Sequence, residues 1–213
     1  MGHFMNFWDQ QFSVSDFRYG HQPNGFLREQ AVRLKPQSEV LLPGDGEGRN
    51  SVWLAEQGYR STAMDSSSVG LEKAVSLARQ RGVSIAVIHA DLADWVPEPA
   101  SFDAVVLTYV HLPPELRPLA HQRLSSALRP GGLFILEAFH PLQLGYQSGG
   151  PKAQAMLYSA DMIRADLNHL PVPVFEEIMA WEGEALLDEG SGHQGLAYLT
   201  RYIARRTLTL ENS

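Results

Sequence analysis

Three closely spaced glycines and a later aspartate are the residues of this sequence with the clearest potential for chemistry. Gly44, Gly46 and Gly48 lie in the run PGDGEG, between a short apolar segment and an amphipathic one. Because glycine has no side chain, a ligand can contact the backbone of such a turn closely. Asp65 ends the next apolar segment, where a carboxylate can accept hydrogen bonds from both hydroxyls of a ribose. The pattern therefore predicts a site for an adenosine-containing cofactor.

A second aspartate and the spacing of the glycines narrow the choice of cofactor. Asp91 follows the third apolar segment, and from there it could accept a hydrogen bond from an adenine amino group. Glu47 would repel a pyrophosphate bound at the turn, and the glycines are spaced GxGxG where dinucleotide sites have GxGxxG. S-adenosylmethionine has the ribose and the adenine, but it carries a sulfonium and an ammonium group and no phosphate. The alternative for each aspartate is an ordinary capping role at a helix or turn.

Residues beside these positions complete the predicted cofactor site. Arg49 directly follows the glycines and could contact the carboxylate of the cofactor or an anionic acceptor; the alternative is a surface position at a helix start. Thr108 and Tyr109 follow the fourth apolar segment, where we expect backbone contacts with the cofactor. The predicted cofactor-binding residues are Gly44, Asp45, Gly46, Glu47, Gly48, Arg49, Asp65, Ser66, Asp91, Leu92, Thr108, Tyr109 and Tyr19.

Transfer of a sulfonium methyl group needs alignment and desolvation more than catalytic side chains, because the methyl carbon is already activated. A base that takes a proton near neutral pH is a useful addition, and imidazole has this property. His111, His140 and His193 are the candidate catalytic residues, with a structural loop position as the alternative for each. Tyr19 and Tyr146 are candidates for the acceptor pocket, with plain packing as the alternative.

The histidines and the absence of cysteine predict no metal site. His111, His121, His140, His169 and His193 show neither HxxH nor HExxH spacing, so a metal site would have to assemble from distant loops. Without cysteine, the chain also lacks disulfides, thiolate zinc ligands and Cys nucleophiles.

Short apolar segments alternate with helix-like stretches from Val40 onward, which is typical of repeated strand–helix–strand units and of an α/β fold. In such sheets ligands bind at the carboxyl ends of the strands. The expected strands cover residues 39–42, 61–64, 85–88, 102–107 and 133–139, and the expected helices cover 50–57, 69–78, 113–128 and 160–167.

The two ends of the chain follow other patterns. Residues 175–187 and 196–208 alternate between apolar and polar side chains around a glycine-containing turn, which predicts an antiparallel hairpin on the edge of the sheet. Residues 1–38 are rich in aromatic side chains and predict a helical cap over the carboxyl edge. We therefore expect a single domain, 1–213, made of the cap (1–38), a cofactor-binding core (39–139), a lid (140–158) and a helix with the hairpin (159–213).

Composition excludes several classes of function. The 213 residues include 24 acidic and 17 basic side chains, giving a net charge of −7, which disfavours a nucleic-acid partner. With 44% hydrophobic and 19% charged residues the chain is typical of globular proteins. It has neither a signal-like start nor a run of about 18 apolar residues. We expect a cytoplasmic protein whose partner is a small-molecule acceptor; the sequence predicts no oligomeric state.

Five segments together resemble the successive motifs of class I S-adenosylmethionine-dependent methyltransferases. They are residues 41–51, 64–65, 90–92, 102–106 and 128–132. Further segments resemble the tellurite-resistance (TehB-like) and thiopurine methyltransferase-like branch, namely 48–51, 8–9, 19–20, 23–24 and 192–195. The resemblance implies a Rossmann-like, doubly wound sheet of seven strands with one antiparallel strand. It also implies acceptors such as tellurium or selenium oxyanions and thiols.

The chain departs from this family at Leu42. The family has an acidic residue at this position, two before the first glycine, where it helps to hold the ammonium group of the cofactor. Asp45 or Glu47 is expected to take this role. The main prediction is methyl transfer from S-adenosylmethionine to a small acceptor, which is a chalcogen oxyanion, a thiol or another small nucleophile. The alternatives are an NAD-dependent oxidoreductase and, because of Leu42, a non-catalytic module that binds S-adenosylmethionine.

Overall fold

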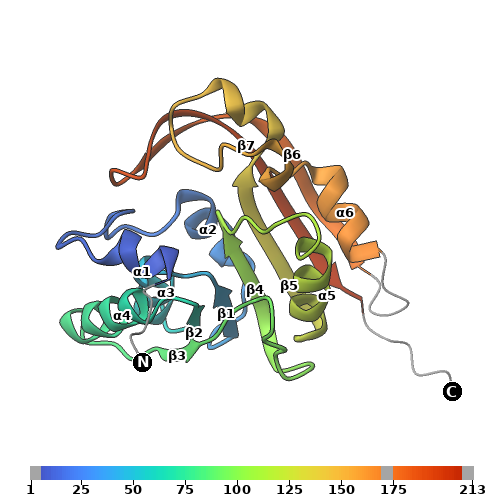
Figure 1. Ribbon diagram of the computed structural model, residues 1–213. Helices are drawn as coiled ribbons and strands as arrows, with labels where there is room; N and C mark the ends of the chain where they lie inside the picture. The colour runs from blue at the N-terminus through green and yellow to red at the C-terminus, as the bar shows by residue number, and fades with distance from the viewer. Residues whose placement is uncertain (1–5, 169–174, 208–213) are drawn as a thin grey trace, which may run out of the picture.

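Seven strands form one sheet in the part of the chain described by this computed structural model, residues 6–168 and 175–207 (Figure 1). Their order is β3-β2-β1-β4-β5-β7-β6. β7 runs antiparallel to both β5 and β6, and the other neighbouring pairs are parallel. The predicted Rossmann-like sheet with a C-terminal hairpin is therefore confirmed. The strands are β1 (Glu39–Pro43), β2 (Arg60–Asp65), β3 (Ala86–His89), β4 (Phe102–Thr108), β5 (Leu128–Phe139), β6 (Phe175–Glu189) and β7 (His193–Arg206).

Helices cover both faces of the sheet because the central strands are apolar on both sides. In β1, Val40 and Leu42 pack with Leu54 of α3 on one face, whereas Leu41 belongs to the core that contains Leu124 of α5 on the other. None of the described helices is long and apolar enough for a membrane span. The helices are α1 (Phe7–Phe12), α2 (Gly25–Gln30), α3 (Arg49–Glu56), α4 (Ser68–Gln80), α5 (Arg117–Ser126) and α6 (Ala160–Asn168), with 3-10 turns η1 (Ala31–Arg33), η2 (Pro141–Gly145) and η3 (Gln154–Met156).

The strand order reverses beside β1. The chain passes from β1 outward to β2 and β3, then returns to the other side of β1 to form β4. At such a reversal the connections leave in opposite directions and open a crevice at the carboxyl ends of the strands. This crevice receives the glycine turn after β1 and the residues that follow β2 and β4.

One predicted helix and the loop after it have different boundaries in the structure. The expected helix over 113–128 begins only at Arg117, after a turn in which the Leu116 N–H donates to the Pro113 carbonyl (2.9 Å). At its other end, Leu128 already pairs with Phe102 in the sheet, and the diglycine after it lies within β5, across an irregularity in the pairing. Both differences reflect sheet pairing and proline geometry that override local helix propensity. Leu208, the expected end of the hairpin, lies outside the described residues.

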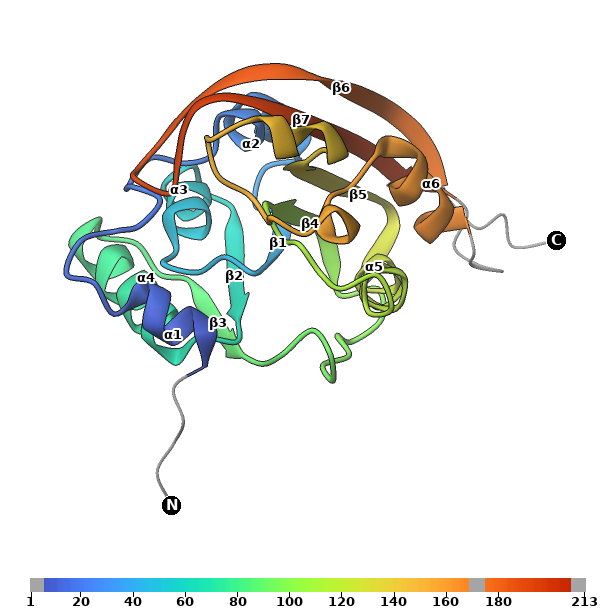
Figure 2. The same ribbon diagram turned by 45° about the horizontal axis from the view of Figure 1, so that its top comes forward.

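The N-terminal segment is divided between two places. Helix α1 docks on the start of α4, where one carboxylate oxygen of Asp9 accepts hydrogen bonds from the Ser67 hydroxyl (2.7 Å) and the Val69 N–H (3.3 Å). Both views show α1 beside α4 (Figure 2). Helix α2 instead packs on a face of the sheet through Phe26 and Leu27. Only the first part of the predicted cap therefore lies over the carboxyl edge.

Candidate functional site

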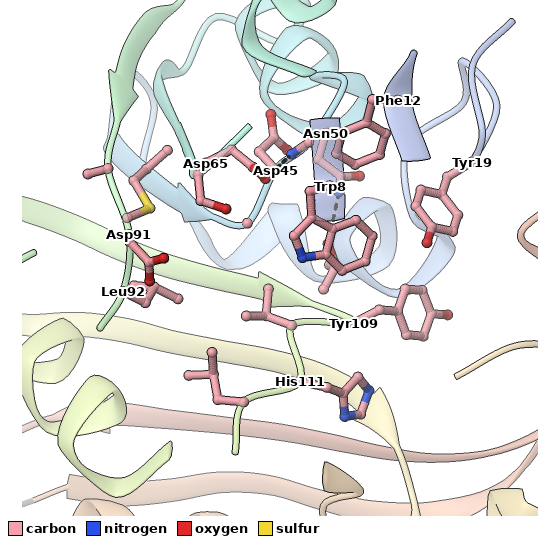
Figure 3. Close-up of a pocket in the computed structure, with 18 of the residues that line it drawn as sticks. Trp8, Phe12, Tyr19, Asp45, Asn50, Asp65, Asp91, Leu92, Tyr109 and His111 are labelled. Carbon is pink, nitrogen blue, oxygen red and sulfur yellow. Dashed lines mark hydrogen bonds between the residues drawn. The ribbon is translucent and has the colours of Figure 1, made fainter. Parts of the chain in front are cut away.

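A cavity of about 320 Å³ lies at the carboxyl ends of β1, β2 and β4 (Figure 3). It brings together side chains from α1, the glycine turn and the loops after β2, β3 and β4, together with His193 at the start of β7. Asp45, Asp65 and Asp91 lie toward one end of the cavity, and Tyr19, Tyr109 and His111 lie toward the other. The lining residues are Trp8, Phe12, Tyr19, Gly44, Asp45, Gly46, Arg49, Asn50, Met64, Asp65, Ser66, Ala90, Asp91, Leu92, Thr108, Tyr109, Val110, His111, Leu112, Pro113, Leu116 and His193.

The glycine turn presents bare backbone to this cavity. Gly44 and Gly46 have φ angles of +67° and +60°, which glycine adopts at no steric cost. The Gly44 N–H donates to the Met64 carbonyl (2.7 Å), so the turn is tied to the end of β2. A Cβ atom on Gly46 would lie 2.9 Å from the ring of Phe12 in α1. The turn is therefore closely covered by the N-terminal segment and leaves no room for side chains at these positions.

Gly48 lies outside the cavity and has a packing role. Its φ is +85°, and a Cβ atom there would lie 2.6 Å from the Cα atom of Ala74 in α4. The close approach allows α3 to begin against α4. We expect Gly48→Ala to lower the free energy of unfolding by about 2 kcal/mol, from the left-handed backbone and the overlap together. Urea denaturation would measure this loss, and a variant as stable as the wild type would contradict the packing role.

Asp65 holds the glycine turn as well as facing the cavity. One carboxylate oxygen accepts the Gly46 N–H and the other accepts the Ser67 N–H, each at 2.8 Å. Because each oxygen has a second lone pair, both can still accept a hydrogen bond from a ligand. Burial raises the pKa of this carboxyl, although the backbone donors oppose the shift. Asp65 thus combines the predicted ligand-facing position with the capping role that was its alternative.

Asp45 is the least satisfied polar group of the cavity. Its side chain is buried, and neither carboxylate oxygen has a hydrogen-bond partner in good geometry. The neighbouring Ser51 hydroxyl donates instead to the Gly48 carbonyl (3.3 Å). Burial raises the pKa of Asp45 to about 7; the nearby Asp65 carboxylate adds to the effect, whereas Ser51 and Arg49 oppose it. A buried carboxylate without a partner is costly, so this position is suited to a cationic ligand.

The loops after β2 and β3 supply the other residues of the acidic end. Asp91 is exposed and lines the cavity, and one of its oxygens accepts the Ala93 N–H at 2.8 Å, so it also forms a local turn. Leu92 is buried in the core beneath it. Ser66 lines the cavity, and its carbonyl accepts a hydrogen bond from Asn6 (2.6 Å). These residues lie where the sequence predicted the adenine end of a cofactor.

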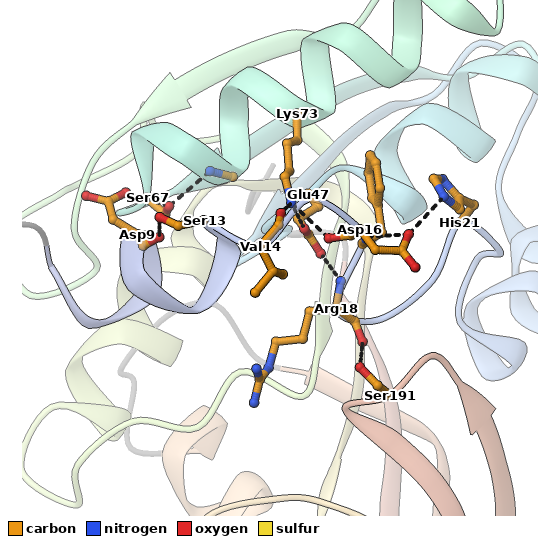
Figure 4. Close-up of polar contacts among 12 residues, drawn as sticks. Asp9, Ser13, Val14, Asp16, Arg18, His21, Glu47, Ser67, Lys73 and Ser191 are labelled. Carbon is orange, nitrogen blue, oxygen red and sulfur yellow. Dashed lines mark hydrogen bonds and ion pairs between the residues drawn. The ribbon is translucent and has the colours of Figure 1, made fainter.

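Glu47 does not line the cavity, contrary to the prediction. Its two carboxylate oxygens accept hydrogen bonds from the Lys73 ammonium and from the Arg18 N–H, each at 2.8 Å (Figure 4). Lys73 also donates to the carbonyls of Val14 and Asp16. Glu47 therefore anchors the N-terminal segment to α4. Of the two candidates for the ammonium role, only Asp45 faces the cavity.

Arg49 lines the cavity but is paired within a buried network that sequence reasoning missed. Its guanidinium contacts Glu189 at 2.5 Å, and Glu189 also accepts a hydrogen bond from Asn24 (3.0 Å). The same Asn24 amide donates to Glu137 (2.5 Å), which Arg201 contacts at 2.6 Å. Burial raises the pKa of Glu137 despite these partners. The network joins α3, the start of α2, β5 and the hairpin behind the aromatic end of the cavity.

The end of β4 carries a strained tyrosine. Tyr109 has a φ of +57°, which costs a non-glycine residue about 1–2 kcal/mol. Its N–H donates to the Glu137 carbonyl (2.8 Å), and its ring stacks on Phe139 with centroids 4.9 Å apart. Just before it, the Thr108 hydroxyl accepts a hydrogen bond from Asn50 (2.9 Å). Asn50 also lines the cavity, and its place in the motif after the glycines was the signal that could have identified it.

Two of the three candidate bases lie in the cavity, and one of these is fully engaged. The His111 Nδ1–H donates to the Met156 carbonyl (2.6 Å), and its Nε2 accepts the Phe139 N–H (3.2 Å). Burial lowers the pKa of His111 to about 4 and that of His193 to about 3. His140 lies outside the cavity: its Nδ1 accepts the Leu142 N–H (3.1 Å) and so begins the turn η2. His111 and His140 therefore have structural positions.

The predicted lid packs on the hairpin and contributes nothing to the cavity lining. Gln143 is buried; it donates to the Ser148 hydroxyl (2.9 Å) and accepts the Tyr198 N–H (2.7 Å). Tyr146, an expected pocket residue, bonds Glu184 of β6 instead. The cavity is covered by Trp8, Phe12 and Tyr19 of the N-terminal segment, of which only Tyr19 was predicted. His169 lies outside the described residues, among which no cluster of three metal-binding side chains occurs.

Comparison with known proteins finds a matching family model and a curated relative. Residues 40–132 match the family model described as a methyltransferase domain. The chain is 27% identical over 133 residues to the 2-heptyl-1-hydroxyquinolin-4(1H)-one methyltransferase of Mycobacteroides abscessus, a match that covers 61% of this chain and 59% of that protein. The matched region therefore spans about three fifths of the relative's length.

Solved structures of other proteins have a similar fold. TehB from Haemophilus influenzae is similar with a TM-score of 0.68 and 18% identity, over 94% of this chain and 66% of that one. The N-methyltransferase NodS from Bradyrhizobium japonicum, solved with S-adenosylhomocysteine, is similar with a TM-score of 0.67 and 16% identity, over 93% of this chain and 96% of that one. At these identities the likeness shows the fold.

Proposed function

We propose that this chain, which contains a class I S-adenosylmethionine-dependent methyltransferase domain, transfers the methyl group of that cofactor to a small-molecule acceptor. The relatives support this proposal, because the matched family model and the curated relative are both methyltransferases. The cavity, of about 320 Å³, supports a small acceptor. The sequence resemblance suggests chalcogen oxyanions or thiols as acceptors.

Asp45 is the observation that carries the proposal. A buried carboxylate without a hydrogen-bond partner fits the ammonium group of a bound amino acid, which would supply both the charge and the missing donors. The same carboxylate would repel the pyrophosphate of a dinucleotide bound at the turn. The site thus supports S-adenosylmethionine over NAD. It also supports a bound cofactor despite Leu42, because Asp45, directly after Gly44, supplies an acidic side chain.

The remaining residues would orient the cofactor and the acceptor. Asp65 would accept hydrogen bonds from the ribose hydroxyls, and Asp91 from the adenine amino group beside Leu92. The cofactor, when bound, supplies a methyl carbon activated by the sulfonium. The aromatic end would hold the acceptor in line with that carbon and exclude water from it. No side chain is required to activate the methyl group itself.

Thermal unfolding with added ligands tests this function. We expect S-adenosylhomocysteine to raise the melting temperature, because a ligand that binds only the folded state stabilises it. NADH should have no effect, and the opposite pattern would support the oxidoreductase alternative. Binding without methyl transfer to any acceptor would instead support the non-catalytic alternative.

A further inference from the structure

The aromatic end of the cavity offers ring surfaces and little charge. We use this name for Tyr19, Tyr109, His111 and His193. Figure 3 shows the first three lying apart from Asp45, Asp65 and Asp91, which form the other end. Among the described lining residues the only cationic side chain is Arg49, which Glu189 holds at 2.5 Å. Tellurite, a compact oxyanion without a ring, would therefore gain neither an unpaired cation nor a ring contact from this lining.

The rings of the aromatic end form a continuous wall. The His193 ring lies 4.4 Å from Tyr19 and 4.3 Å from Tyr109, measured between centroids. Tyr109 continues the wall by stacking on Phe139. Trp8 lines the same cavity while 39% of its surface stays exposed, so a ligand could cover it. Such a wall gains most from a flat aromatic ligand, because offset and edge-to-face ring contacts add to apolar burial.

This wall contains no group that would take a proton at neutral pH. Both nitrogens of His111 are already hydrogen-bonded, to the Met156 carbonyl and the Phe139 N–H. The buried Nδ1 of His193 has no partner, and burial, together with the neighbouring Arg49, His111 and Arg18, lowers the pKa of this ring to about 3. The result is a neutral imidazole and a very weak base.

The phenol of Tyr109 is equally unsuited to that task. Burial and the nearby carboxylates of Glu137 and Glu189 raise its pKa well above the usual value, so it stays protonated. Arg49, which acts in the opposite direction, does not offset them. An acceptor that had to lose a proton inside the site would therefore have no recipient in this wall.

We infer that the acceptor is a flat aromatic molecule whose ring hydroxyl ionises in solution and is methylated as the oxyanion. This inference rests on the proposed function. The proton leaves to the solvent before binding. A lone pair on the oxygen of the ionised hydroxyl then forms the O–CH₃ bond while the S–CH₃ bond breaks. The electron pair of the S–CH₃ bond stays on sulfur. An anion and a cation become two neutral products, a change that a poorly solvated aromatic site favours.

A series of acceptors of graded acidity tests this inference. Calorimetry would measure the binding of 4-nitrophenol, 4-cyanophenol and phenol to the protein saturated with S-adenosylhomocysteine, at a series of pH values. In separate assays with S-adenosylmethionine, kcat/KM would be recorded against pH for each phenol. The pH at which each acceptor begins to bind and react should follow the acidity of its own hydroxyl. A single inflection shared by all three would show that a protein group takes the proton, and would overturn the inference.

Competing acceptors and two variants complete the experiment. Sodium tellurite and 2-mercaptoethanol should neither bind measurably nor compete with 4-nitrophenol; tight binding of either one, with none of the phenols, would also overturn the inference. Tyr19→Ala should weaken phenol binding about tenfold through lost ring contact. The matched control His140→Ala, outside the cavity, should leave phenol binding unchanged. Failure of S-adenosylhomocysteine itself to bind would instead contradict the proposed function.

Discussion

Asp45→Asn is expected to weaken the binding of S-adenosylhomocysteine about 100-fold, because it removes the charge that pairs with the ligand's ammonium group. The amide has nearly the same shape, so the backbone of the glycine turn and its contacts with Met64 and Phe12 should remain. Isothermal calorimetry on the wild type and the variant measures the difference. An unchanged affinity would remove Asp45 from the cofactor site.

The same substitution should stabilise the protein without ligand. The pKa of Asp45 is 3.8 in the unfolded chain and about 7 in the folded one, so the folded state resists ionisation. The wild type therefore loses stability as pH rises between these values, and at pH 8 the loss reaches about 4 kcal/mol at most. Asparagine is neutral throughout. Urea denaturation at pH 4 and pH 8 should show a variant advantage that grows with pH, and a variant less stable at pH 8 would contradict this account.

Glu47→Gln is the matched control, because it removes a carboxylate charge two residues away but outside the cavity. We expect the affinity for S-adenosylhomocysteine to stay near the wild-type value. The protein should be destabilised, since the Lys73 ammonium loses its charged partner. The two variants thus have opposite effects on stability and different effects on binding, which separates the ligand-facing carboxylate from the structural one.

Asp65→Ala should be the most damaging of the single substitutions at the acidic end. It removes the acceptor for the Gly46 and Ser67 N–H groups and, in the proposed complex, for the ribose. We expect the affinity for S-adenosylhomocysteine to fall at least about 100-fold, together with a loss of stability of about 2–3 kcal/mol. Calorimetry and urea denaturation measure the two effects separately.

Asp94→Ala is a suitable control for Asp65→Ala. Asp94 is exposed and lies outside the cavity lining, in the loop that follows β3. Its removal should leave binding unchanged. Equal affinities for the Asp65→Ala variant and the wild type would contradict the ribose-binding position, whatever the effect on stability.

Local sequence patterns were sufficient to predict the part of the fold that forms the glycine turn and the acidic end of the cavity. The strand before Gly44, the turn and α3 are contiguous, so their geometry follows from glycine placement and apolar periodicity. The cap of α4 is also local, because the Ser67 hydroxyl accepts the N–H of Gly70 three residues later. The helix expected over 113–128 was too long, because the pairing of Leu128 with Phe102 is not local information.

Roles that depend on distant partners could not be predicted in this way. Glu47 was expected to face the ligand, because the local sequence does not indicate that it pairs with Lys73 of α4. His111 was a candidate catalytic base, but its ring is held by the Met156 carbonyl of the turn η3, 45 residues further along the chain. The network around Asn24 and Glu137 combines residues from opposite ends of the sequence. Only the folded chain shows which polar side chains already have partners.

Calorimetric titration of the wild type with S-adenosylhomocysteine at pH 6, in two buffers of different ionisation enthalpy, tests the central claim most directly. At that pH Asp45 is mostly protonated, because burial raises its pKa to about 7. Pairing with the ligand's ammonium group requires the carboxylate, so binding at one site per chain should release close to one proton to the buffer. No heat of binding, or a heat that is the same in both buffers, would contradict the claim that Asp45 receives the cofactor's ammonium group.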